Sequence, residues 1–140
     1  MKAIPHLSIL AFLLAIAPNP CFALITIENV TRERAKELGM EIRSHAAGPD
    51  AVRIALEFEA KGALKDYSRV DLEMWDGGKL LISSSLREDK SNPGRVIVSF
   101  AADRANLDKI TLRVVVQSAP RSMHGFDLRM KDFVDLDKIR

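Results

Sequence analysis

Cysteine is almost absent from this chain of 140 residues, which contains only Cys21. Residues 24–140 have none, which excludes a disulfide, a thiolate metal site and a thiol nucleophile from that part of the chain. Aromatic residues are also few, with one tryptophan and one tyrosine. Neither sign of charge is in excess, because residues 24–140 carry 19 acidic residues and 20 basic ones, the 21 of the whole chain less Lys2. This balance argues against the attraction of nucleic acid or an anionic membrane surface.

The first 23 residues contain the longest apolar run, at 7–17 (LSILAFLLAIA), behind a short start that includes Lys2. The run is too short to cross a bilayer comfortably. After it, Cys21-Phe22-Ala23 offers small residues at the two positions that a signal peptidase reads. The layout predicts a secretory signal over 1–23 and an exported protein, periplasmic or extracellular, with no membrane span once the leader is removed. Lipid attachment at Cys21 is the alternative interpretation.

Hydrophobic and polar residues alternate along most of residues 24–140, a period of two that predicts strands with one buried and one exposed face. In the clearest run, from Val52 to Phe58, Glu57 falls on the face expected to be exposed. The apolar sets are Val52, Ile54, Leu56, Phe58; Val70, Leu72, Met74; Leu80, Ile82, Leu86; Val96, Val98, Phe100; Ile110, Leu112, Val114, Val116; and Phe126, Leu128, Met130. Shorter candidates lie at 24–30 and 40–44. Roughly seven or eight such strands without long amphipathic helices predict one all-β domain over 24–140, an antiparallel Greek-key β-sandwich, with a closed lipocalin-type barrel as the rival.

Turn residues separate these strands. The sequence at 76–79 (DGGK) predicts a tight hairpin, because glycine tolerates the positive φ that such turns require. Loops are expected at 48–50, 91–94 and 118–122. Thr31 is placed to cap a short N-terminal helix through Leu38, which Gly39 would close, and residues 103–108 predict a second helical turn.

The number and spacing of the strands, with the turn at 103–108, are similar to immunoglobulin-like and fibronectin type III domains over most of residues 24–134. The resemblance implies that architecture. It names a fold and not a family, because the sequence has no cysteine pair of the antibody type.

Trp75 is the first candidate for a binding residue. Its parity is opposite to that of Leu72 and Met74, so we expect it on the outer face, beside the hairpin tip. The flat apolar face of an exposed tryptophan suits a partner protein or a sugar ring. Alternatively, the helix at 31–38 or the C-terminal tail covers it. Tyr67, one loop away, would join either arrangement.

Histidine and methionine suggest a second type of site. His45 and His124 lie beside predicted loops, and Met123 precedes His124. Imidazole and thioether groups together suit copper, and soft sulfur favours Cu(I). The competing interpretation is that both histidines are ordinary surface residues, while Met74 and Met130 follow the buried parity of their strands and fill the core.

Signatures of catalysis are missing. The serines at 83–85 lack the Gly-x-Ser-x-Gly elbow, and no phosphate-binding glycine loop, zinc spacing or calcium loop occurs. We therefore predict an exported, non-catalytic domain without a cofactor that binds another envelope or secreted protein. The alternatives are a periplasmic copper carrier that uses His45, Met123 and His124, and an enzyme whose active groups are scattered over loops.

Overall fold

The strands of this protein are arranged in two sheets. A computed structural model describes residues 25–59, 67, 69–86, 94–119 and 122–139, so the predicted leader over 1–23 and most of the predicted loop at 91–94 lie outside the described residues. The strands are β1 (Ile25–Asn29), β2 (Met40–Ala46), β3 (Ala51–Glu59), β4 (Arg69–Asp76), β5 (Lys79–Ser85), β6 (Arg95–Asp103), β7 (Ile110–Ala119) and β8 (Ser122–Arg129). The helices are α1 (Arg32–Glu37) and α2 (Met130–Phe133), with 3₁₀ turns η2 (Arg104–Lys109) and η3 (Leu136–Lys138).

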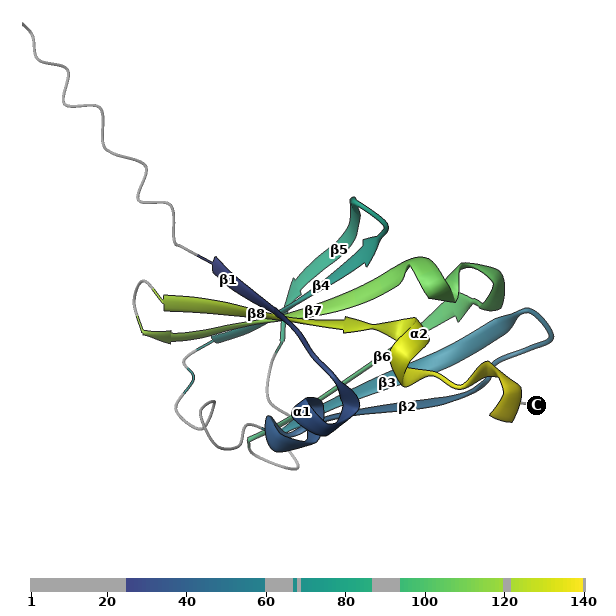
Figure 1. Ribbon diagram of the computed structural model, residues 1–140, viewed down its shortest axis with the longest axis horizontal. Coiled ribbons are helices and arrows are strands. Elements are labelled where there is room, and N and C mark those ends of the chain that lie inside the picture. The colour runs from purple at the N-terminus through teal and green to yellow at the C-terminus, as the bar shows by residue number, and fades with distance from the viewer. Residues whose placement is uncertain (1–24, 60–66, 68, 87–93, 120–121, 140) are drawn as a thin grey trace, which may run out of the picture.

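One sheet has five strands in the order β1-β8-β7-β4-β5, and the other has three in the order β2-β3-β6. Figure 1 shows the three-stranded sheet as a layer below the five-stranded one. The chain changes sheet between β1 and β2, between β3 and β4, between β5 and β6, and between β6 and β7. The prediction of an all-β protein is therefore confirmed.

The prediction that every strand pair is antiparallel is wrong for one pair. Strand β1 runs parallel to β8, with Ile25 opposite Met123 and Asn29 opposite Asp127. The other pairs are antiparallel. β1 and β8 are far apart in the sequence and no hairpin turn connects them. A hairpin turn forces the two strands that it joins to be antiparallel, and this constraint does not apply to β1 and β8.

The core lies between the sheets and takes side chains from both. The alternating residues of β3, β4, β7 and β8 face it, as their period of two predicts. The buried residues of this alternating set are Val52, Ile54, Leu56, Phe58, Val70, Leu72, Met74, Ile110, Leu112, Val114, Val116, Phe126 and Leu128. Val96 of β6 joins them, and Val98 and Phe100 pack against the cluster while partly exposed. Alternation within a strand thus identified the buried face in each of these strands.

Strand β5 departs from its prediction. Leu80 and Ile82 are expected to share one face, but all seven residues of β5 are exposed. A bulge at Met74 and Trp75 sets Leu80 opposite Trp75 and Ile82 opposite Met74, so Leu81 is an extra residue in the pairing. A bulge breaks the alternation on which the expectation rests. In Figure 1 the β4–β5 hairpin points away from β2, β3 and β6.

The local turns follow from their sequences. The Thr31 hydroxyl accepts a hydrogen bond from the Arg34 backbone N–H at 3.2 Å, which caps α1, and Gly39 beyond the helix has φ +81°. Asp76 pairs with Lys79 across the predicted two-residue hairpin, and Gly77 has φ +56°. The Asp103 carboxylate caps η2 by accepting a hydrogen bond from the Ala105 backbone N–H at 3.0 Å.

Candidate interaction surface

Trp75 lies on the face of the five-stranded sheet that points away from the core, as its parity predicts. It is half-buried beside the β4–β5 turn. Its indole N–H donates a hydrogen bond to the Glu73 carboxylate at 3.0 Å. The Arg113 guanidinium of β7 lies 5.1 Å from the centre of the indole ring, within the range of a cation–π contact. The tryptophan is therefore held in one orientation by two neighbours on its own face.

Arg113 is itself fixed by Asp127, which stands directly opposite it on β8. Two hydrogen bonds at 2.6 and 3.0 Å join the guanidinium to the two carboxylate oxygens, and Glu73 lies 3.8 Å away on the other side. The hydrogen bond to Asp127 raises the pKa of Arg113. The side chains of Arg113 and Asp127 are only 21% and 12% exposed, so this pair is stronger than a surface ion pair. Glu73, Arg113 and Asp127 form one row across β4, β7 and β8.

The same face also carries apolar packing. Val115, two residues along β7 from Arg113, is 3% exposed although it lies outside the core cluster. Opposite it is Gly125, where a Cβ atom would meet the Arg113 Cδ at 3.3 Å and the Ile27 Cγ1 at 3.4 Å. The absence of a side chain at Gly125 allows Arg113 and Ile27 to lie close over β8. We call the surface formed by Glu73, Trp75, Arg113 and Asp127 the Trp75 surface.

Tyr67 does not join the Trp75 surface. Its ring packs against Phe58 at a centroid distance of 5.6 Å and contacts the core cluster, whereas Trp75 lies on the opposite side of β4. The two aromatic residues that the sequence suggested for binding, Trp75 and Tyr67, thus lie on different sides of the sheet. Sequence spacing gives no sign that Glu73, Arg113 and Asp127 are partners of Trp75, and only the register of β4, β7 and β8 reveals them.

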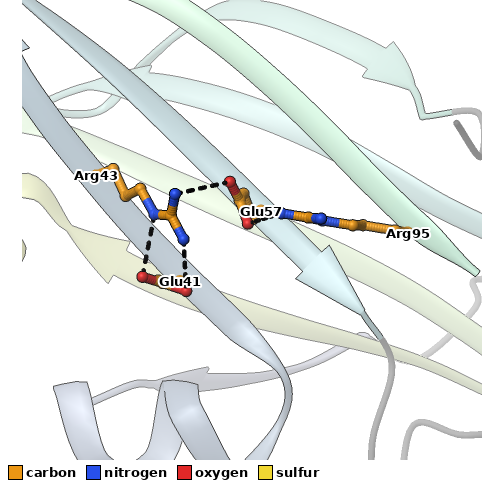
Figure 2. Close-up of polar contacts among 4 residues, drawn as sticks. All are labelled: Glu41, Arg43, Glu57 and Arg95. Carbon is orange, nitrogen blue, oxygen red and sulfur yellow. Dashed lines mark hydrogen bonds and ion pairs between the residues drawn. The ribbon is translucent and has the colours of Figure 1, made fainter. Parts of the chain in front are cut away.

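A second polar cluster lies on the outer face of the three-stranded sheet, and Figure 2 shows its four members. Arg43 contacts Glu41 at 3.1 Å and Glu57 at 3.6 Å, while Arg95 forms an ion pair with Glu57 from the other side. Glu41 and Glu57 stand directly opposite each other, so the two arginines offset a repulsion between like charges. The hydrogen bond from Arg43 lowers the pKa of Glu41.

The expectation that Glu57 is exposed is wrong. Its side chain is 16% exposed, because the long side chains of Arg43 and Arg95 cover it. Parity places Glu57 on the outer face, but it does not account for neighbours that fold over it. The four charges of the cluster balance and each carboxylate has an arginine partner. The cluster therefore ties β2, β3 and β6 together and presents no unmatched charge of its own to a ligand.

The residues of the copper hypothesis lie on two different sheets. His45 is exposed on β2, in the three-stranded sheet, while Met123 and His124 are on β8, in the five-stranded sheet. The ring of His124 is stacked with Phe126 at a centroid distance of 6.3 Å. Met74 and Met130 are buried in the core. In the described part of the chain, no three or more His, Cys, Asp or Glu residues gather in a way that could hold a metal ion. The copper carrier stays a prediction from the sequence.

Comparisons with known proteins add no family. The chain matches no protein family model, and no curated protein matches it in sequence. Among the residues that the structure describes, no helix is both long enough and apolar enough to cross a membrane. Function must therefore be inferred from the surfaces described above.

Proposed function

We propose that the protein is an exported, non-catalytic binding domain that acts by contacting another envelope or secreted protein. The leader predicted over 1–23 supports export. The Trp75 surface supports binding. The two parts of the proposal are independent, because a binding domain can work in any compartment, and each has its own test.

We also infer that the fold is a Greek-key sandwich of the immunoglobulin or fibronectin type III kind. Without β1, seven strands remain, and β2, β3 and β6 face β4, β7 and β8 across one core, with β5 exposed at the edge of the larger sheet. Hairpins join β2 to β3, β4 to β5 and β7 to β8, while the remaining connections cross between the sheets. This combination of hairpins with connections that cross between the sheets supports a Greek-key arrangement. Such domains commonly work as binding modules, but that is an analogy of fold alone.

The observation that carries the binding proposal is the fixed orientation of Trp75 and Arg113. Tryptophan and arginine are the residue types that contribute most at protein interfaces. Here both are ordered before any partner arrives, Trp75 by Glu73 and Arg113 by Asp127. Ordering in advance reduces the entropy that binding must otherwise remove from long side chains. The surface therefore has the composition and the rigidity of a binding anchor.

Capture from an envelope extract tests the proposal. The wild-type exported domain is immobilised beside Trp75→Ala, with Arg53→Ala as the matched control, because Arg53 is exposed on β3 of the other sheet. We expect a discrete partner that the wild type and Arg53→Ala retain equally. Loss of Trp75 should weaken its capture by about 2 kcal/mol or more, roughly thirtyfold, with the folded far-UV spectrum unchanged. Equal capture by all three proteins would refute the role of Trp75, and no specific capture by the wild type would count against the proposed function.

A further inference from the structure

Strand β5 is an open edge of the five-stranded sheet. It pairs with β4 on one side, and it is the last strand in the sheet order. All seven of its residues, Lys79 to Ser85, are exposed. An edge strand presents unpaired backbone N–H and C=O groups, which are ready to pair with another strand.

This edge is also unusually apolar. Leu80, Leu81 and Ile82 are 43%, 45% and 52% exposed, and they are half of the six large hydrophobic residues exposed in the described chain. Apolar side chains on an unpaired edge favour association between chains. Because Leu80 and Ile82 pair with residues on opposite faces of β4, both sides of the edge offer apolar contact.

The other edge strands carry the charges that prevent pairing between edges. Strand β1 has Glu28, β2 has Glu41 and Arg43, and β6 has Arg95 and Asp103. Charged side chains along an edge are a common device against association. Strand β5 has a single charge, at its first residue, followed by six uncharged ones (LLISSS). β5 is therefore the edge strand with the least charge to prevent pairing, and it is the edge most open to another strand.

We propose that the occupant of this edge is a second copy of the chain, paired antiparallel through β5 about a two-fold axis at Ile82. The part of the strand next to the axis is self-complementary in this register. Leu81 stands opposite Ser83 of the other copy on each side of the axis, so a large side chain meets a small one, while the bulge turns Leu80 to the other face and ends the regular pairing there. Lys79 lies beyond the bulge and away from the axis, so the two lysines do not oppose each other. The two Ile82 side chains, the most exposed of the apolar set, meet on the axis.

The pairing would join the two five-stranded sheets into one of ten strands. A two-fold axis perpendicular to a sheet keeps equivalent faces on the same side, so both copies would present Trp75 on one surface. Their β4 strands would be three strand spacings apart, about 14 Å. This inference goes beyond the proposed function, because Trp75 can bind a partner whether or not the chain pairs with itself.

Sedimentation of the exported protein tests the pairing. We expect a dimer for the wild type and, for Ile82→Lys, a dissociation constant raised about tenfold or more, since two lysines would meet on the axis. Ile97→Lys is the matched control, because Ile97 is 49% exposed on the edge strand β6. It should dimerise as the wild type does. A wild type that remains monomeric up to about 0.1 mM would overturn the proposal, as would equal losses in both variants.

Oxidative cross-linking places the axis independently. Residues 24–140 contain no cysteine, so Ile82→Cys introduces a single thiol into that part of the chain. On the two-fold axis it faces its own equivalent, and we expect a disulfide-linked dimer under mild oxidation. Ile97→Cys should remain monomeric in the same conditions. Equal cross-linking of both variants, or binding of an unrelated apolar extended peptide at β5 without any dimer, would overturn the assignment to a second copy.

Discussion

Removing Arg113 should destabilise the fold and release Trp75 together, because one side chain holds both Asp127 and the indole ring. Arg113→Ala leaves the Asp127 carboxylate, which is only 12% exposed, without its two hydrogen bonds. A fully buried charge left unpaired costs about 3–5 kcal/mol, and an exposed pair contributes about 1 kcal/mol at most. The partial burial of this pair places the expected loss at about 2–3 kcal/mol in the free energy of unfolding.

A double-mutant cycle isolates the pair from the packing of the arginine stem. Arg113→Ala, Asp127→Ala and the double variant are unfolded in urea, with far-UV circular dichroism as the probe. We expect a coupling of about 1–2 kcal/mol between the two changes. Additivity within about 0.5 kcal/mol would refute the idea that the two side chains act as a unit.

Fluorescence gives a second readout of the same perturbation. Trp75 is the only tryptophan of the chain, so its emission reports this surface alone. Without the guanidinium over the ring, the emission of Arg113→Ala should shift to longer wavelength and be quenched more readily by acrylamide. The exposed Arg53→Ala on the other sheet should leave it unchanged. An emission that does not respond to the loss of Arg113 would contradict the contact between the two residues.

Three further outcomes are expected. Phe58→Ala should cost about 3–5 kcal/mol of stability because Phe58 is fully buried in the core, whereas the exposed change Arg53→Ala on the same strand should stay within about 0.5 kcal/mol; similar urea midpoints would mean that the face is wrongly assigned. The hydrogen bond from Arg43 lowers the pKa of Glu41 from 4.5, so the stabilisation from this pair is complete above pH 4.5 and is lost as the pH falls through the lowered pKa. In Arg43→Ala, an NMR titration should find the pKa of Glu41 back near its ordinary value. An unchanged pKa would show that Arg43 is not what lowers it. Intact mass of the exported form should place its N-terminus at Leu24, and a retained leader or an attached lipid would disprove the predicted cleavage.

The core could be predicted because alternation along a strand is a local property. The buried face of β3 follows from four residues spaced by two, and no other part of the chain is needed to identify it. The same reasoning gave the wrong result for β5, because burial there depends on the register with β4. The bulge at Met74 and Trp75 changes that register and interrupts the alternation. The parallel pairing of β1 with β8 has no local signal, since its partners come from opposite ends of the domain.

The candidate surface was predictable in part for the same reason. The outward direction of Trp75 follows from its parity within β4. Its partners Arg113 and Asp127 come from strands whose alignment depends on the register of β7 with β8, which shifts between Gln117 and Ala119. For Glu57, parity correctly predicted that the side chain lies on the outer face. It did not predict the burial of the side chain, which depends on arginines from two other strands.

The pairing of β1 with β8 has a consequence for the order in which the chain folds. Ile25 and its partner Met123 are 98 positions apart, so the first strand to be synthesised pairs with the last. Contacts between such distant segments form late and slow the folding of β-rich domains. Until β8 is complete, β7 also lacks one of its two neighbours, and the segment Val114-Val115-Val116 is left at an open edge. A nascent chain that ends before residue 122 would therefore be the species most prone to aggregate, and a chaperone that binds extended apolar segments would act at that stage.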